Sequence, residues 1–345
     1  MITKPTVLVL GAGVSYSYGY PTGMGLMKDI FTQITSNAWR EIYGACGLDH
    51  KEMDALKSEL YLSHKPSIDA FLEHRRDEFL KPGKLAIALS LLSQENPDIF
   101  HNFSVRDNGI YDFLYHNLAT SWEEFKENKL TIITFNYDRS LEYFLFSALK
   151  HSYNKTDAQV AEMMQCIPIV HVHGSLGPLP WQESGGIDYY PLFGRKDDGY
   201  VIGKRIKVAT ENIVIVSEAE PKSKEFALAM RTIKEAERIY FLGFGYYRAN
   251  LERLGLSQLP IVDSAALDVF YDLGYGDREA SKTNTITMWL RRGYAGASYI
   301  IKQFRGTAFG LGSAQMKSIQ GEWRIGLPDN KCTALEFLKE YANLS

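Results

Sequence analysis

The feature that most constrains this chain is a set of four short apolar runs, each of which stops at glycine or at polar residues. The runs cover residues 6–10, 130–135, 167–172 and 238–242. Continuous apolar runs of this length that end at turn residues are typical of strands buried on both faces of a parallel sheet. Segments with helical periodicity separate the runs. The sequence therefore predicts an α/β fold built on an open, doubly wound parallel sheet.

A long helical segment interrupts this alternation between the first two runs. Residues 36–128 contain apolar patterns with the period of a helix and almost no β-branched runs. Ser67 is placed to cap a helix that begins at Ile68. A length of 345 residues gives a prior of about two domains. Because the strand pattern resumes after the insertion, we expect one domain over residues 1–345 that carries a helical insertion at 36–128.

Residues 256–345 form a C-terminal extension whose pattern matches nothing specific. Leu290-Arg291-Arg292 and the aromatic residues around it fit either an assembly surface or a solvated face beside additional core. Smaller expectations are helices at 24–35, 138–149, 222–237, 250–254 and 335–341, strands at 214–217 and 267–271, and a hairpin within 189–208 that turns at Asp197-Asp198-Gly199.

Charge and cysteine content argue against several classes of protein. Lys and Arg number 38 against 41 Asp and Glu, so no basic excess favours a nucleic-acid partner. The three cysteines, Cys46, Cys166 and Cys332, are far apart and odd in number, which predicts neither a disulfide framework nor a zinc site. This usage favours a reducing, cytoplasmic setting. The apolar runs are too short to span a bilayer, so we expect no membrane attachment.

The residues that follow the strands are the candidates for a ligand site, because ligands of open α/β sheets bind outside the carboxyl ends of the strands. The first strand leads into Gly11-Ala12-Gly13-Val14-Ser15. Such a loop allows close backbone approach and offers N–H groups to a phosphate. It departs from the dinucleotide pattern G-x-G-x-x-G, since Tyr16 stands at the third glycine position. A simple strand-to-helix turn is the alternative interpretation.

The next two strand ends present polar and titratable side chains. Asn136 and Asp138 follow the second run, where Asp138 can cap a helix and Asn136 can present its amide to a sugar hydroxyl or a water. His171 and His173 lie two residues apart and hence on one face of the third strand. A metal pair is one interpretation, although no acidic or cysteine partner stands at ligand spacing. His173 precedes Gly174 at the open end of the strand, where a general base can reach a ligand.

Taken together and in this order, the four motifs resemble the sirtuin superfamily. They are Gly-Ala-Gly-x-Ser near the N-terminus, Thr-x-Asn-x-Asp after a strand, His-Gly after the next strand, and the late glycine loop Gly243-Phe244-Gly245. The resemblance implies a Rossmann-like fold that cleaves the nicotinamide–ribose bond of NAD+. It assigns the catalytic roles to Asn136, Asp138 and His173, with His173 as general base. It assigns cofactor contacts to Gly11, Ala12, Gly13, Ser15, Thr22, Thr134, Gly243 and Gly245.

Two departures from the deacylase sirtuins shift the expected activity. No cysteine occurs between Cys166 and Cys332, where deacylases carry a four-cysteine zinc module, so we expect no metal. Gly19-Tyr20-Pro21-Thr22-Gly23 replaces the acidic, aromatic and basic trio of the deacylases. The pattern is similar to the sirtuin-like NAD+ hydrolases of bacterial anti-phage defence, in which a segment like Ser67 to Phe71 also occurs.

The resemblance therefore implies an NAD+ glycohydrolase that releases nicotinamide and ADP-ribose. It further implies a homo-oligomer or a complex with a second defence protein, such as an ATPase, an Argonaute-like protein or a sensor. Two alternatives stay open. One is an NAD+-dependent protein deacylase or ADP-ribosyltransferase, and the other is a non-catalytic subunit that senses NAD+ or ADP-ribose.

Overall fold

The computed structural model describes residues 1–65, 67–193, 199–215, 223–244, 250, 253 and 254, together with the backbone of four strands between 288 and 326. The strands are β1 Thr6–Leu10, β2 Leu130–Thr134, β3 Ile169–His171, β4 Arg238–Leu242, β5 Met288–Arg292, β6 Tyr299–Lys302, β7 Met316–Ile319 and β8 Trp323–Gly326. The α-helices are α1 Ala12–Ser15, α2 Gly23–Thr35, α3 Asn37–Ala45, α4 His50–Leu62, α5 Ile68–His74, α6 Arg76–Gln94, α7 Phe103–Asn108, α8 Ile110–Leu118, α9 Ser140–Tyr153, α10 Asp157–Met164, α11 Gly199–Asn212 and α12 Lys224–Glu235.

The main sheet has the strand order β3-β2-β1-β4-β5-β8. β1 pairs in parallel with β2 on one side and with β4 on the other, so that Thr6 lies opposite both Leu130 and Arg238. The chain moves outward from β1 to β3 and then returns to place β4 on the opposite side of β1. The strand order therefore reverses between β1 and β4, which is the point where ligands bind in open sheets. The expected doubly wound, Rossmann-like α/β fold is confirmed.

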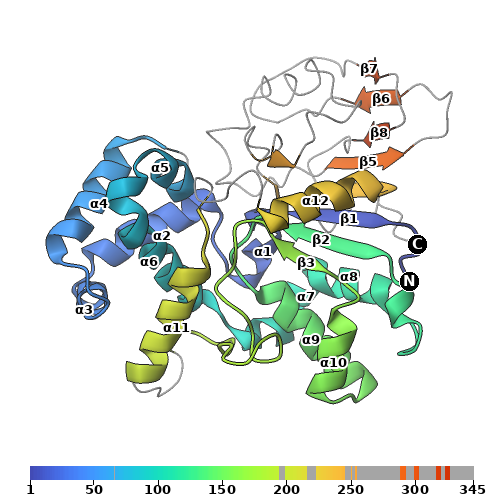
Figure 1. Ribbon diagram of the computed structural model, residues 1–345, viewed down its shortest axis with the longest axis horizontal. Coiled ribbons are helices and arrows are strands. Elements are labelled where there is room, and N and C mark those ends of the chain that lie inside the picture. The colour runs from blue at the N-terminus through green and yellow to red at the C-terminus, as the bar shows by residue number, and fades with distance from the viewer. Residues whose placement is uncertain are drawn as a thin grey trace.

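The parallel strands lie between two layers of helices. All five residues of β1 and all five of β4 are buried, as expected for strands covered on both faces. Figure 1 shows α12 above the sheet and α8, α9 and α10 below it. The carboxyl ends of β1, β2 and β3 point toward the lobe formed by α2 to α6.

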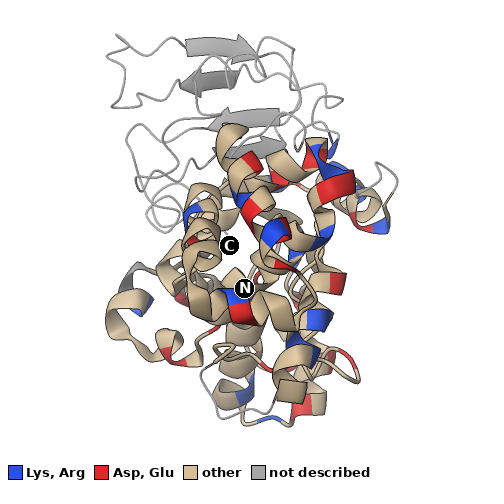
Figure 2. Cartoon of the chain, turned by 90° about the vertical axis from the view of Figure 1, so that its left-hand side faces the viewer, with Lys and Arg blue, Asp and Glu red and all other residues tan. Residues whose placement is uncertain are grey.

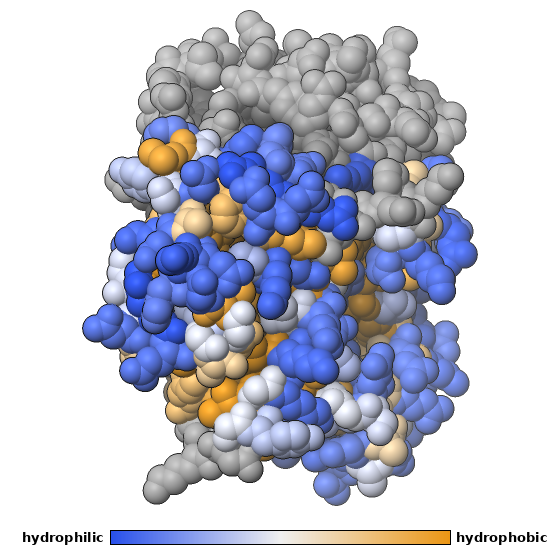
Figure 3. Space-filling view, turned by 60° about the vertical axis from the view of Figure 1, so that its left-hand side comes forward, coloured by the Kyte–Doolittle hydropathy of each residue, from blue (hydrophilic) through white to orange (hydrophobic). Residues whose placement is uncertain are grey.

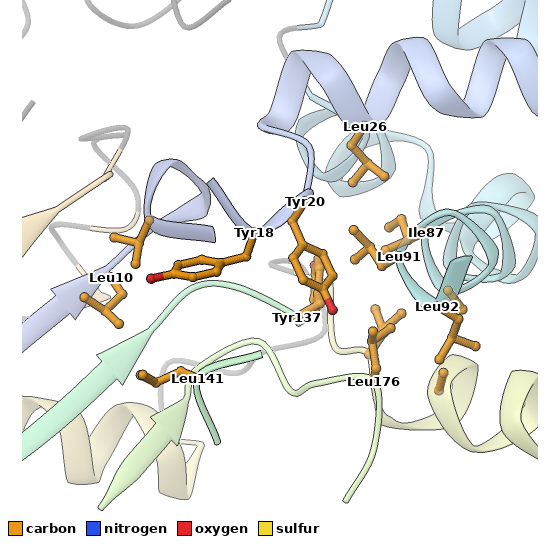
Figure 4. Packing of buried hydrophobic residues seen from close by; sticks show 14 of the residues in the cluster. Leu10, Tyr18, Tyr20, Leu26, Ile87, Leu91, Leu92, Tyr137, Leu141 and Leu176 are labelled. Atoms are coloured by element: carbon orange, nitrogen blue, oxygen red, sulfur yellow. The ribbon is translucent and has the colours of Figure 1, made fainter. Parts of the chain in front are cut away.

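Residues 36–128 are helical, as predicted, and they share one apolar core with the sheet. Helix α6 is the centre of this lobe, since all of its residues from Leu85 to Leu92 are buried. Figure 4 shows Tyr18 and Tyr20, which follow α1, lying between Leu10 of β1 and the leucines of α6. Packing this continuous with the sheet makes the insertion part of the same folding unit.

Helix α5 has the N-terminal cap that the sequence predicts. The Ser67 hydroxyl accepts a hydrogen bond from the Ala70 N–H at 3.2 Å, which satisfies one of the free donors at the helix start. Helix α4 begins with a full capping box between Asp49 and Glu52. Local sequence therefore sets where both helices begin.

The predicted hairpin within residues 189–208 is wrong, because residues 199–212 form helix α11. Its buried residues are Arg205, Ile206 and Ala209, which are spaced as on one face of a helix. Asp197 and Asp198 themselves lie outside the described residues. The sequence pattern was ambiguous because a turn signature preceded a segment with both β-branched and charged residues. Packing of α11 against α6 decides the outcome.

Other boundaries differ in detail. Strand β3 is shorter than predicted. Residues 214 and 215 are not in a strand, although Ile213 before them forms an isolated bridge with Gly174; residues 216 and 217 of the predicted strand lie outside the described residues. The helix expected at 222–237 is α12, and the helix expected from Asp138 begins at Ser140. The strand predicted at 267–271 and the helix predicted at 335–341 lie outside the described residues.

Part of the C-terminal extension belongs to the main sheet. Strand β5, which contains Leu290-Arg291-Arg292, pairs antiparallel with β4, and β8 pairs antiparallel with β5. Strands β6 and β7 form a separate antiparallel pair. The sheet is therefore mixed, with four parallel strands extended by two antiparallel ones, which the sequence did not reveal.

Charges of both signs are mixed on the side of the molecule shown in Figure 2, where Lys and Arg are interspersed with Asp and Glu over the helices. Figure 3 shows hydrophobic residues mostly in recesses between protruding hydrophilic side chains. None of the helices in the described part of the chain is both long and apolar enough to cross a bilayer.

Candidate functional site

Two glycine loops meet in backbone contact at the point where the strand order reverses. A Cβ atom at Gly11 would lie 2.4 Å from the Gly243 carbonyl oxygen, and one at Gly243 would lie 2.4 Å from the Val14 nitrogen. Gly243 also has a φ of +60°, which disfavours other residues. The Gly13 N–H donates to Gly243 O at 3.1 Å. Close packing of the loops thus requires both glycines.

Asn136 lies directly beside the first of these loops. Its side-chain amide donates to the Gly11 carbonyl at 3.1 Å and to the Ser15 hydroxyl at 3.0 Å. Its backbone N–H donates to the Thr134 hydroxyl at 3.1 Å. No described residue donates a hydrogen bond to its Oδ1 atom. The amide nitrogen is therefore held by two hydrogen bonds, while the amide oxygen remains available as an acceptor.

Asp138 is buried and its carboxylate is held by hydroxyl groups. The Ser15 hydroxyl donates to Oδ2 at 2.7 Å, and both the backbone N–H and the hydroxyl of Ser140 donate to Oδ1. Burial raises the pKa of Asp138, and the hydrogen bonds from Ser140 and Ser15 oppose that rise. The Tyr111 hydroxyl contacts Ser140 at 2.7 Å and extends the network. Both carboxylate oxygens are thus engaged within the protein.

His171 forms a hydrogen bond to the backbone carbonyl of Asn136. Its Nδ1 atom lies 2.8 Å from the Asn136 carbonyl oxygen, and its Nε2 atom contacts the Glu142 carboxylate. Burial lowers the pKa of His171, but the Glu142 charge and hydrogen bond outweigh it and the net shift is upward. Because both partners are acceptors, the ring carries hydrogen on both nitrogens. His171 therefore positions Asn136 and is not free to bind a metal.

His173 has the opposite environment. Its side chain is 4% exposed, and neither ring nitrogen has a hydrogen-bond partner among the described residues. The rings of Phe135 and Phe226 enclose it, with centroids at 5.3 and 5.6 Å. Burial, aided by the charge of Arg253, lowers the pKa of His173 to about 4, while a weak interaction with the Asn250 side chain, outside normal hydrogen-bond geometry, opposes that shift. The imidazole is therefore neutral at physiological pH and can accept a proton.

A buried ion pair joins this site to the loop that follows it. Arg139, next to Asp138, is 1% exposed and forms a bidentate pair with Glu95 at the end of α6, with both bonds at 2.9 Å. The same guanidinium donates to the carbonyl oxygens of Gly177, Pro178, Ile187 and Asp188. Arg205 of α11 adds a second guanidinium to Glu95 at 3.2 Å. The pair fixes residues 177–188 against the start of α9.

The structure brings together most of the residues predicted for the site. Gly11, Ser15, Asn136 and Asp138 form one hydrogen-bonded group, to which Thr134 is bonded through the Asn136 N–H. Gly13 donates to Gly243, and the loop of Gly243 packs against Gly11. Ala12 is the first residue of α1. Thr22 precedes α2 and shares no hydrogen bond with this group among the described residues. Gly245 lies outside the described residues.

Several residues of the site escaped the sequence analysis. Glu142, Ser140 and Arg139 belong to the start of α9, where a helix pattern hides their role. Asp69 accepts a hydrogen bond from the Tyr137 hydroxyl at 2.5 Å, which ties α5 of the insertion to the loop between Asn136 and Asp138. The sequence analysis noted Ser67 as a helix cap, but it included Asp69 only as part of the Ser67 to Phe71 segment named by the resemblance. Its contact with Tyr137 now gives Asp69 a physical role.

No group of three or more His, Cys, Asp or Glu side chains suited to a metal ion occurs among the described residues. No family model matches this chain, and comparisons with curated proteins and with solved structures also find no match. Any function must therefore be argued from the site itself.

Proposed function

We propose that this protein is an NAD+ glycohydrolase that releases nicotinamide and ADP-ribose. The observation that carries the proposal is a buried, neutral His173 without a hydrogen-bond partner, beside a fixed Asn136 at the carboxyl ends of the parallel strands. Phe135 links the two, since it precedes Asn136 in the chain and its ring contacts His173. The resemblance of the motifs to sirtuins supplies the substrate class.

The proposed reaction suits these side chains. The bond between the ribose C1′ and the cationic nicotinamide nitrogen breaks, and its electron pair neutralises the pyridinium ring, so the leaving group needs no acid. Water adds to C1′ and transfers its proton to His173, which returns it to solvent. The Asn136 Oδ1 atom accepts a hydrogen bond from the ribose or the water and thereby orients it. His171 and Asp138 act indirectly by holding Asn136 and Ser15.

The test is to follow NAD+ loss and nicotinamide release with the purified chain. Asn136→Ala and His173→Ala should each lower turnover by about a hundredfold or more, the scale of losing a positioning or general-base group. His151→Ala, at an exposed histidine of α9, serves as the matched control and should keep full activity. Thermal unfolding of each variant separates loss of activity from loss of fold. Full activity in both site variants would contradict the assignment.

The same assay separates the alternatives. Nicotinamide release that requires an added acyl peptide or acceptor protein would favour a transferase, and NAD+ binding without turnover would favour a sensing subunit. A role in anti-phage defence, as a homo-oligomer or with a second protein, is proposed on the resemblance alone. A chain that neither binds nor cleaves NAD+ would overturn the proposal.

A further inference from the structure

Asn136 is held by hydrogen bonds through its side chain and its backbone, and one of these bonds comes from a group that titrates near neutral pH. Its side-chain amide donates to Gly11 and Ser15, and its N–H donates to the Thr134 hydroxyl. Its carbonyl oxygen lies 2.8 Å from Nδ1 of His171. Amide and hydroxyl groups do not titrate under conditions in which proteins stay folded, whereas an imidazole ordinarily titrates near pH 6.5. The hold on Asn136 therefore depends on the protonation of His171.

The second ring nitrogen of His171 faces a carboxylate from another element. Its Nε2 atom contacts the Glu142 carboxylate at the start of α9, and the side chains of His171 and Glu142 are 14% and 5% exposed. His74 and His116 also approach carbonyl oxygens through Nδ1, but both are exposed on helices, where water can pair with the other nitrogen. At His171 the two protein partners, rather than water, decide where the hydrogen atoms lie.

The fully protonated pair of His171 and Glu142 holds two hydrogen atoms. One lies on Nδ1 and points to the Asn136 carbonyl, because a carbonyl oxygen only accepts. The other lies between Nε2 and the Glu142 oxygen. Burial opposes a charge on the ring, but Glu142 of α9 and Asp138 of the loop after β2, the carboxylates that act on it, outweigh burial and raise the pKa of His171. Both hydrogen atoms are therefore present at pH 6.5 and below.

Loss of one proton from this pair to solvent forces a choice between the two ring nitrogens. The remaining hydrogen can stay on Nδ1, which leaves the Nε2 lone pair against the Glu142 carboxylate, or it can lie on Nε2 and donate to that carboxylate. A hydrogen bond to a charged acceptor is about twice as strong as one to a neutral acceptor. The hydrogen therefore lies on Nε2, and Nδ1 then presents a lone pair to the Asn136 carbonyl.

Resting on the proposed function, we propose that Glu142 is a positioning residue that acts with His171 to break the hydrogen bond to the Asn136 carbonyl as the pH rises. In the protonated state Nδ1 donates to this carbonyl, and in the deprotonated state two acceptors face each other there. Their repulsion displaces the peptide that carries the Asn136 side chain, so that its Oδ1 atom orients the ribose or the water poorly. The pair thus sets an alkaline limit on turnover without contacting the substrate.

The decisive variant is Glu142→Gln, because a glutamine amide can donate to Nε2 as well as accept from it. Neutral His171 can then keep its hydrogen on Nδ1. Wild-type kcat for NAD+ should fall about five- to tenfold as the pH rises from about 6.5 to 9, the scale of one neutral hydrogen bond, with little change in KM. The kcat of Glu142→Gln should stay level over this range.

Two further variants complete the pH series. His171→Phe has no donor for the Asn136 carbonyl, so its kcat should be low at every pH. Glu41→Gln, at an exposed position of α3, is the matched control and should follow wild type. Thermal unfolding at each pH shows that the proteins compared are folded. A wild-type kcat that does not fall with pH, or that falls equally in Glu142→Gln, would overturn the inference.

Nitrogen NMR of the imidazole rings tests the pair without NAD+. The signals of His171, assigned by comparison with His171→Phe, distinguish a hydrogen on Nδ1 from one on Nε2. Wild type should lose the hydrogen on Nδ1 as the pH rises, whereas Glu142→Gln should retain it. A hydrogen that stays on Nδ1 in wild type would overturn the inference. A wild type that does not cleave NAD+ would contradict the glycohydrolase proposal, and the NMR result alone would then decide whether Glu142 controls the bond to Asn136.

Discussion

The candidate site has two halves, one around Asn136 and Asp138 and the other around His173 and Arg253. They differ in how many of their buried polar groups have hydrogen-bond partners within the protein. Around Asn136 and Asp138, no fully buried side-chain polar atom lacks a partner, and Asn136 Oδ1 alone accepts no bond from the described residues; the hydrogen bonds run from Gly11 through Ser15 to Ser140. Around His173 and Arg253, buried nitrogen atoms have none. Yet both halves lie at the carboxyl edge of one sheet. The difference indicates a fixed framework on one side and a place for a ligand on the other.

This difference has an energetic meaning. A saturated network stabilises the fold and holds its members in one geometry, whereas an unpaired buried group costs stability until a ligand pairs with it. The first half should therefore lose stability when it is mutated, and the second should gain it. Four experiments, ordered by expected effect, test that contrast.

The largest loss is expected at the ion pair behind the saturated half. Glu95→Ala leaves the buried guanidinium groups of Arg139 and Arg205 without their carboxylate. Breaking a buried pair in this way typically costs about 3–5 kcal/mol. Urea unfolding should show a matching decrease in the free energy of unfolding, with Glu41→Ala, at an exposed position of α3, close to wild type. A loss below about 1 kcal/mol would show that the pair does not stabilise this part of the fold.

The clearest contrast is a pair of substitutions with opposite expected signs. Asp138→Ala removes the acceptor for Ser15 and Ser140 and should lower the free energy of unfolding by about 1–3 kcal/mol. His173→Leu replaces an unpaired buried ring by an apolar side chain of similar size and should leave stability unchanged or raise it. Both should abolish NAD+ cleavage. Destabilisation by His173→Leu comparable to that by Asp138→Ala would remove the distinction between the two halves.

The stability contributions of His173 and His171 should depend on pH in opposite directions. Folded His173 has a pKa of about 4 against about 6.5 when unfolded, so the folded state binds fewer protons between these values. The contribution of His173 to the free energy of unfolding must then fall as pH decreases from 6.5 toward 4. Because the buried carboxylates are the same in both proteins, the difference between wild type and His173→Leu measures the effect of His173 alone. Folded His171 has a raised pKa, so its contribution is complete below pH 6.5 and is lost as pH rises through the folded value.

Thermal or urea unfolding of wild type, His173→Leu and His171→Gln across pH 4 to 9 measures both contributions. The His173→Leu curve should diverge from wild type on the acid side and the His171→Gln curve should converge with it on the alkaline side. Parallel curves for all three proteins would contradict the opposite environments.

The smallest effect on stability is expected at the hydrogen bond between Asp69 of the helical insertion and Tyr137, next to Asn136. Tyr137→Phe removes the hydrogen bond to Asp69 and should cost about 1 kcal/mol in unfolding free energy. Because the bond ties α5 to the loop that carries Asn136, it should also lower the kcat for NAD+ severalfold. Tyr61→Phe, at a tyrosine that is 69% exposed on α4, is the matched control. Equal kcat in both variants would separate the insertion from the site.

Much of the fold could be predicted because its signals are local. The segments at 6–10 and 238–242 are continuously hydrophobic after their first residues, Thr6 and Arg238, and both are followed by glycine; they form β1 and β4. Ser67 marked the start of α5 for the same reason. Residues 199–212 were misassigned as part of a hairpin, since the face that α11 buries is fixed by contact with α6 and not by local pattern. The addition of β5 and β8 to the sheet depends on long-range pairing, which periodicity does not encode.

The candidate site could likewise be predicted where it depends on local sequence, but not where it depends on long-range contacts. Position after a strand was sufficient to select Asn136, Asp138 and His173. The sequence did not show which of these side chains have hydrogen-bond partners in the protein. Ser140 and Glu142, which supply some of those partners, look like ordinary helix residues until α9 folds against β3. Arg253 was also missed, since a single arginine far along the chain has no sequence signal that links it to His173.

The pairing of β5 with β4 has a consequence for how the chain may be shortened. All five residues of β4 are buried, and its outer side is bonded to β5 from Arg238–Arg291 to Phe241–Met288. A version of the protein that ends before residue 288 would turn this apolar strand into an open edge. Exposed edges of this kind recruit further strands, so such a truncation should aggregate even though its parallel core and its candidate site are intact in sequence.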